Sequence, residues 1–187
     1  MEQKVNKIIN EIKRLSAQKE HILVAIDGKC GAGKTTLSAE LQKRLQCTVF
    51  HMDDFFLRPE QRTEERLKTA GENIDHERFL EEVLLPLSEN RPVIYRTYDC
   101  SSQTLSEPIE KLPCSVTITE GSYSCHPKLW DYYDLHVFMD VDSETQYARI
   151  ILRSGLLVAE IYKKKWIPLE EDYFHTYMIK EKCEICI

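Results

Sequence analysis

Residues 28–35 contain glycine, lysine and threonine at a spacing that suits the binding of phosphate groups. Gly28, Gly33, Lys34 and Thr35 fit the pattern G-x-x-x-x-G-K-[ST], and the five apolar residues 22–26 stand just before it. A short, uninterrupted apolar run is typical of a strand that is covered on both faces, and the residues after the loop have helical composition. Strand, glycine-rich loop and helix in this order predict a phosphate-binding loop.

The residue types of this loop each have a chemical role. Glycines let backbone N–H groups turn toward one point, and the helix that follows adds free N–H groups and the positive end of its dipole. Lys34 would reach the β- and γ-phosphates, and the Thr35 hydroxyl would ligate Mg²⁺. We therefore expect ATP and Mg²⁺ as cofactors. The residues expected to hold the nucleotide are Gly28, Gly31, Ala32, Gly33, Lys34, Thr35 and Thr36.

Acidic residues follow two further short apolar runs. Residues 47–52 predict a strand that ends at Asp53 and Asp54, and residues 115–119 predict one that ends at Glu120. Ligands of open α/β sheets bind beyond the carboxyl ends of the strands, so these acids should face the loop. Asp53 is the best candidate for the base that receives a hydroxyl proton, with Asp54 as its rival, and Glu120 for the acid that orients the water shell of Mg²⁺. Either carboxylate could instead cap a loop.

A later helix carries two arginines one turn apart. Residues 136–139 predict a fourth core strand, and Ser143 is a plausible N-cap for the helix with Arg149 and Arg153. These arginines could neutralise charge on a transferring phosphoryl group, although they could also be a solvated helix face. The candidate catalytic residues are Lys34, Asp53, Glu120, Arg149 and Arg153.

The composition narrows the class of protein. A chain of 187 residues with net charge −6 predicts one acidic domain, which argues against a general nucleic-acid or membrane-surface binder. Seven cysteines without framework spacing indicate reduced thiols, and Cys183 and Cys186 predict a terminal strand rather than a metal site. No apolar run reaches 18 residues, so we expect a cytoplasmic protein; a homo-oligomer is compatible with the sequence.

The remaining patterns predict an α/β protein with the P-loop NTPase fold: a parallel sheet sandwiched by helices, with a mobile lid. Residues 1–19 form an amphipathic helix, and residues 57–110 an acceptor-binding insertion in which 57–73 are either a solvated loop or a flap. Asp75 should cap the helix that follows, and Pro92 to Tyr98 should be extended. Residues 154–168 should be a basic lid segment between helices, followed by a last helix over 169–181 and a strand over 183–187.

These motifs resemble the uridine kinase group of P-loop kinases, which includes phosphoribulokinase, bacterial pantothenate kinase and nicotinamide riboside kinase. The resemblance runs through GKCGAGKTT, HMDDFF, NIDHERF, the Tyr-Asp pair at 98–99, ITEG and DLHVFMDVDSETQYARIILR. It implies that Asp53 accepts the hydroxyl proton of the acceptor and that Asp75 holds ribose hydroxyls. It also implies that Glu120 is the Walker-B-like acid and that Arg149 and Arg153 belong to the lid. Phe56 and Tyr98 join the expected acceptor-binding residues.

Several positions depart from the uridine kinase pattern. Phe56 replaces a tyrosine, and Cys100 and Gln103 stand where the group has an aromatic residue and a pyrimidine-reading histidine. In the lid, Ile150 and Ser154 replace an arginine and an aspartate. The machinery for phosphoryl transfer is therefore mostly retained while the base-reading pocket is altered.

The resemblance leaves two acceptors open. Uridine or cytidine is the first choice from the majority of the group, and nicotinamide riboside is the second. The second rests on Asp-Asp-Phe-Phe at 53–56, the Pro59-Glu60 pair, and the Trp166 and Pro168 element. Two other classes remain, a non-enzymatic nucleotide sensor and an ATPase that drives a partner, but neither gives the Asp-x-Phe-Phe and Ile-Asp-His elements a role.

Overall fold

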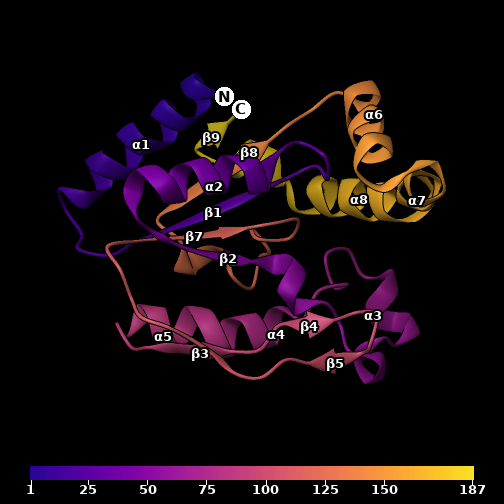
Figure 1. Ribbon diagram of the computed structural model, residues 1–187, viewed down its shortest axis with the longest axis horizontal. Coiled ribbons are helices and arrows are strands. Elements are labelled where there is room, and N and C mark those ends of the chain that lie inside the picture. Colours follow the sequence, from indigo (N-terminus) through magenta and orange to yellow (C-terminus); the bar gives the residue numbers. More distant parts are fainter.

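A parallel sheet of five strands, in the order β2-β7-β1-β8-β9, forms the centre of the computed structural model, which describes residues 1–187 (Figure 1). Each neighbouring pair in this sheet is parallel. The strands are β1 (Ile22–Gly28), β2 (Thr48–His51), β7 (Val116–Glu120), β8 (Leu135–Met139) and β9 (Ile185–Cys186). The predicted α/β fold and all five predicted strands are confirmed.

Burial explains why these apolar runs are strands. Every residue of β1, β7 and β8 is buried, as expected for strands covered on both faces. The register pairs Ile26 with Glu120 and His51 with the same Glu120. The carboxyl ends of β1, β2 and β7 therefore meet at one edge of the sheet.

Alternate side chains of β1 point into two separate cores. Ile22, Val24 and Ile26 pack beneath helices α1 (Glu2–Ser16) and α2 (Lys34–Leu45). Leu23 and Ala25 belong to the opposite core, which aromatic residues from the insertion and from the C-terminal helices fill. Figure 1 shows α1 and α2 on one side of the sheet and the insertion on the other. The predicted amphipathic helix at the N-terminus is confirmed, although it ends at Ser16.

The insertion combines a helix with two small antiparallel ribbons. A continuous helical run comprises α4 (His76–Phe79), a π-helical turn (Leu80–Leu84) and α5 (Leu85–Ser88). Asp75 caps it as predicted, because its carboxylate accepts the backbone N–H of Arg78 at 3.2 Å. The predicted extended segment is β3 (Val93–Tyr95) and β4 (Tyr98–Asp99), which pair with β6 (Ile109–Lys111) and β5 (Thr104–Leu105). The segment 57–73 contains two short helices, a 3₁₀ turn (Pro59–Gln61) and α3 (Glu64–Lys68).

In the C-terminal part, the structure differs from three of the predicted element boundaries. Asp142, not the predicted Ser143, caps α6 (Ser143–Ser154), because its carboxylate accepts the Thr145 N–H at 2.8 Å. Residues 154–168 are not a segment between helices: after Gly155 the chain runs through α7 (Leu156–Ile161), a π-helical turn (Tyr162–Trp166) and α8 (Ile167–Tyr177). Pro168 directly follows the π-helical turn, where the regular α-helical hydrogen-bond pattern is already interrupted.

The third correction concerns the last predicted helix, 169–181. It divides into α8 and α9 (Ile179–Lys182) at Met178, which adopts a left-handed conformation with φ 51°. No helix in the protein combines the length and the apolar composition that crossing a bilayer requires.

A buried aspartate joins the phosphate loop to the rest of the fold. Asp27 has no exposed surface, and its Oδ1 accepts the N–H groups of Gly28 at 2.6 Å and Tyr123 at 3.1 Å. Its Oδ2 accepts the Cys125 N–H and the Tyr173 hydroxyl, each at 2.9 Å. Burial raises the pKa of this carboxyl to about 6, and the surrounding donors oppose that shift. The four donors come from β1, the loop after β7 and α8, so one side chain fixes three segments.

Two glycines of the loop should respond very differently to a side chain. A Cβ at Gly28 would lie 2.1 Å from the carbonyl oxygen of Met139 in β8, whereas a Cβ at Gly33 would meet nothing within 4 Å. Gly28→Ala should therefore destabilise the fold by at least about 3 kcal/mol, because the strand backbone cannot move aside. Gly33→Ala adds only backbone strain, about 1–2 kcal/mol. Urea unfolding of both variants without ligand checks this, and equal losses of stability would contradict the predicted packing.

Candidate active site

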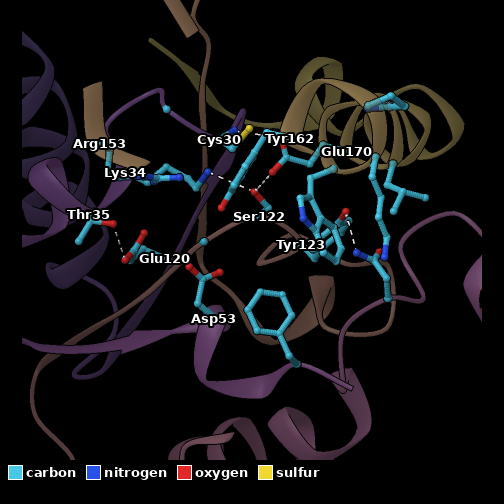
Figure 2. Close-up of a pocket in the computed structure, with 18 of the residues that line it drawn as sticks. Cys30, Lys34, Thr35, Asp53, Glu120, Ser122, Tyr123, Arg153, Tyr162 and Glu170 are labelled. Carbon is cyan, nitrogen blue, oxygen red and sulfur yellow. Dashed lines mark hydrogen bonds between the residues drawn. The ribbon is translucent and has the colours of Figure 1, made fainter. Parts of the chain in front are cut away.

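A cavity of about 1310 Å³ opens at the carboxyl edge of the sheet (Figure 2). The phosphate loop and the start of α2 line one side, and the 3₁₀ turn after β2 (Met52–Phe55) and the insertion line another. Helices α6 and α8 close the cavity. The segment 57–73 contributes Leu57, Arg62, Leu67 and Asn73 to its wall. That segment is therefore part of the cavity rather than a loop in solvent.

The loop presents a lysine and free N–H groups to this cavity. The Lys34 ammonium donates to the carbonyl oxygens of Gly28 at 2.6 Å and Lys29 at 3.1 Å, and only 8% of the residue is exposed. The N–H groups of Gly31 and Gly33 have no acceptor within the chain. A lysine held across a loop with free donors is an arrangement that attracts phosphate.

A threonine and a glutamate lie together beside the loop. The Thr35 hydroxyl donates to Glu120 Oε1 at 3.1 Å. Two oxygen ligands at right angles on one Mg²⁺ ion lie about 2.9 Å apart, so these hard oxygen atoms fit that ion. The sequence did not single out His51, whose Nδ1 lies 2.6 Å from the same carboxylate oxygen. Its hydrogen bond with Glu120 raises the pKa of the imidazole.

Asp53 faces the cavity and Asp54 does not. Asp53 is among the lining residues, and Figure 2 shows it beside Glu120. Asp53 is exposed to the cavity, yet desolvation by the surrounding walls raises the pKa of its carboxyl, and the Lys34 charge opposes that shift. Asp54 is half-buried and lies outside the cavity. The geometry therefore favours Asp53 over its rival as the group that can receive a proton.

The two predicted arginines also reach the cavity. Arg149 and Arg153 both line it, and the Arg149 guanidinium donates to the Gly31 carbonyl at 3.0 Å. The Arg153 guanidinium lies 5.4 Å from the centre of the Tyr162 ring, which comes from the π-helical turn before α8. Helix α6 thus brings two positive charges to the cavity, with Arg149 against the loop and Arg153 beside Tyr162.

Not every predicted residue reaches the cavity. Phe56 and Thr36 line it, but Gly28, Ala32, Asp75 and Tyr98 do not. Gly28 contributes its carbonyl to Lys34, and the Ala32 N–H donates to the Lys29 carbonyl within the loop.

Asp75 and Tyr98 are buried in the insertion. Only 1% of Asp75 and 6% of Tyr98 are exposed. Asp75 Oδ2 lies 3.5 Å from the Arg78 Nε and 3.7 Å from the Arg58 Nε. Neither that oxygen nor the Tyr98 hydroxyl has a hydrogen-bond partner, and buried polar groups are rarely left so.

Other lining residues were not predicted from the sequence. Ser122 and Tyr123 follow Glu120 at the end of β7, so their position after a strand was an available signal. Tyr162, Lys164, Lys165, Trp166 and Glu170 come from the helical run Leu156–Tyr177. The sequence Lys-Lys-Lys-Trp in this run did not indicate a role for it, and no local sequence pattern identified Glu170 as a site residue.

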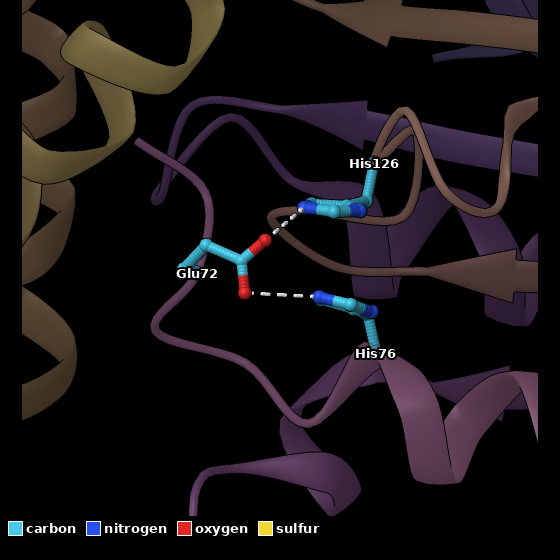
Figure 3. A group of neighbouring side chains, drawn as sticks. All are labelled: Glu72, His76 and His126. Atoms are coloured by element: carbon cyan, nitrogen blue, oxygen red, sulfur yellow. Dashed lines mark hydrogen bonds and ion pairs between the residues drawn. The ribbon is translucent and has the colours of Figure 1, made fainter. Parts of the chain in front are cut away.

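Glu72, His76 and His126 form a second cluster, outside the cavity (Figure 3). Glu72 contacts the Nε2 atoms of His76 at 3.0 Å and His126 at 3.7 Å. The two imidazole rings stack with centroids 4.2 Å apart and planes 15° apart. A metal ion lies in the plane of the imidazole that binds it, so two rings stacked in this way cannot share one. His126 Nδ1 also accepts the Lys128 N–H, which leaves the proton of a neutral ring on Nε2. Glu72 therefore forms a hydrogen bond with His76 within the insertion, while His126 Nε2, in the loop after β7, is buried without a hydrogen-bond partner.

Comparisons with known protein sequences match most of this chain to one protein family. A profile of the phosphoribulokinase/uridine kinase family matches residues 23–155. Uridine-cytidine kinase B of Dictyostelium discoideum is 28% identical over 153 residues, which are 76% of this chain and 62% of that protein. The uridine kinase of Macrococcus caseolyticus is 31% identical over 142 residues, 70% of this chain and 68% of that enzyme. The match thus spans less than two thirds of the Dictyostelium protein.

Solved structures show the same fold. A candidate uridine kinase from Bacillus stearothermophilus superposes with TM-score 0.71 at 19% identity, over 100% of this chain and 98% of that one. A candidate fructose transport system kinase from Silicibacter sp. TM1040 superposes with TM-score 0.75 at 23% identity, over 98% of each chain. The P-loop kinase fold predicted from the sequence is confirmed.

Lys34 should matter for phosphate binding more than for folding. Lys34→Ala removes the ammonium, so ADP affinity should fall at least about a hundredfold, because charge-assisted contacts to phosphate are lost. Two carbonyl oxygens lose a donor, which should cost only about 1 kcal/mol of stability without ligand. Calorimetric ADP titration and thermal unfolding measure both effects. The exposed Lys43→Ala on α2 is the matched control. A Lys34→Ala protein that binds ADP normally would remove the lysine from the site.

Proposed function

The chain belongs to the phosphoribulokinase/uridine kinase family, and from that premise we propose that it is an ATP-dependent kinase that phosphorylates a hydroxyl of a nucleoside-like acceptor. The observation that carries the proposal is that one cavity holds Lys34, Glu120 and Asp53 together. A cationic loop for the donor and a carboxylate for the acceptor hydroxyl are what phosphoryl transfer requires. The relatives named above are kinases of uridine and cytidine.

On the donor side, Lys34 and the free loop N–H groups would bind the phosphates of ATP. Thr35 and Glu120 would hold Mg²⁺, which neutralises phosphate charge when it is bound. Arg149 and Arg153, on the lid formed by α6 and the helices after it, would add positive charge where the transferred group passes. These charges stabilise the negative oxygens of the transition state more than those of bound ATP, so they act on turnover.

On the acceptor side, Asp53 would receive the proton of the attacking hydroxyl. The hydroxyl oxygen forms a bond to the γ-phosphorus, the bond from that phosphorus to the β–γ bridging oxygen breaks, and ADP leaves. The proton ends on the Asp53 carboxylate. Because the cavity walls partly desolvate Asp53 and raise its pKa, this carboxylate is a better proton acceptor than an aspartate in open solvent.

For the acceptor itself we propose a riboside phosphorylated on its 5′ hydroxyl, with uridine or cytidine first and nicotinamide riboside second. Asp75 would accept hydrogen bonds from the 2′ and 3′ hydroxyls, with Phe56 and Tyr98 nearby. The unpartnered Asp75 Oδ2 and Tyr98 hydroxyl support this, since an acceptor could satisfy both. Both groups lie outside the cavity, so the proposal requires the insertion to rearrange when the acceptor binds.

Replacing the two neighbouring aspartates separates their roles. Asp53→Asn keeps the shape of the side chain and removes the base, so turnover should fall at least about a hundredfold while ATP affinity changes little. Asp54→Asn should have a mild effect. Since the base must be deprotonated, wild-type turnover should be lost as pH falls through the raised pKa of Asp53, and Asp53→Asn should lack this loss. ADP-release assays measure both, and a crippled Asp54→Asn beside an active Asp53→Asn would reverse the assignment.

An acceptor screen tests the proposed function directly. ADP release should be stimulated by ribosides, and 2′-deoxy analogues should be poorer by about tenfold or more, because a carboxylate built to pair a hydroxyl is left unpaired. The screen compares uridine, cytidine, nicotinamide riboside, pantothenate and sugar alcohols. Turnover of pantothenate but of no riboside would remove the role of Asp75. No ATP turnover with any acceptor would contradict the kinase itself.

A further inference from the structure

The phosphate loop already binds an anion from its own chain. Glu170, in the first turn of α8, is only 5% exposed and extends to the loop (Figure 2). Its Oε2 accepts the backbone N–H of Cys30 at 3.0 Å, and its Oε1 accepts the Ser122 hydroxyl at 2.5 Å. A carboxylate of the lid helix therefore occupies one of the donors of a loop whose geometry suits phosphate.

The same contact extends to the loop lysine. The Lys34 ammonium donates to the Ser122 hydroxyl at 3.3 Å. The Glu170 carboxylate, the Ser122 hydroxyl and the Lys34 ammonium are therefore joined by two consecutive hydrogen bonds. The pKa of the Cys30 thiol is raised to about 12, first by burial and second by the negative charge of Glu170. Glu170 is thus a fixed negative charge beside the group that attracts nucleotide phosphate.

Other contacts hold α8 in place without Glu170. The Tyr173 hydroxyl donates to the buried Asp27 at 2.9 Å, and Phe174 packs edge-on against Phe138 of β8. Tyr173 is fully buried. A carboxylate is not required to anchor this helix, and a buried charge next to an anion site usually weakens stability rather than adding to it.

We propose that Glu170 is a specificity-determining residue that competes with the terminal phosphates of the donor nucleotide for the phosphate loop. This inference rests on the proposed nucleotide site. A lysine of this kind of loop reaches the β- and γ-phosphates. A carboxylate linked to Lys34 through Ser122 therefore opposes the binding of that end of a triphosphate. Glu170 lowers the affinity for triphosphates and diphosphates and leaves a monophosphate nearly unaffected. The donor binds tightly only when the carboxylate gives up the Cys30 N–H.

The test compares nucleotide affinities of charge-removing variants. Glu170→Gln should tighten the binding of a non-hydrolysable ATP analogue at least about fivefold, because one like charge near the phosphates is gone. Glu170→Ala should tighten it as well, and AMP affinity should be unchanged in both variants. Asp172→Asn is the matched control: it removes one carboxylate charge from an exposed position two residues further along α8, and should change no affinity. Titration calorimetry provides the dissociation constants.

The sign of the change separates this role from a structural one. If Glu170 only supports the loop, both Glu170 variants bind the ATP analogue more weakly or equally well, and the inference is overturned. An equal gain in Asp172→Asn would also overturn it, because bulk charge would then be the cause. If the wild-type protein binds no nucleotide, the proposed function fails first and the inference fails with it. Tighter binding of the analogue in both Glu170 variants, with AMP unchanged, supports it.

Discussion

The carboxylate of Asp27 is the interaction on which the site depends. Each of its two oxygens accepts two hydrogen bonds, and the donors come from the loop, from the chain after β7 and from α8. Because a buried carboxylate without donors would be very costly, these three segments are held in one arrangement. Ser122 precedes one of the donors, and Glu170 lies one helical turn before another. The placement of both around the loop therefore follows from one buried charge.

The cavity concentrates positive charge in an acidic protein. The chain has net charge −6. The residues that line the cavity nevertheless include Lys34, Arg149, Arg153, Lys164 and Lys165. Asp53, Glu120 and Glu170 stand among them. A pocket of mixed charge with a cationic excess fits a small phosphorylated ligand that needs both a metal-binding acid and a base. It does not resemble the extended basic surface of a nucleic-acid binder.

Two of the positions that depart from the uridine kinase pattern, Cys100 and Gln103, lie in the insertion. Cys100 lines the cavity, but Gln103, at the position of the pyrimidine-reading histidine, lies in the turn between β4 and β5 with φ 57°. It is not among the lining residues.

The sequence by itself determined the parts of the protein that local patterns encode. Apolar runs predicted the strands, G-x-x-x-x-G-K-T predicted the loop, and one-turn spacing placed Arg149 and Arg153 together, because burial and helical periodicity act over a few residues. Only the tertiary structure decided which distant groups meet. Glu170 reaches Cys30 across 140 positions, and His51 shares a carboxylate with Thr35 through strand register. The tertiary structure also buries Asp75 and Tyr98 within the insertion, outside the cavity. Such contacts depend on how whole elements pack, and no spacing along the chain records them.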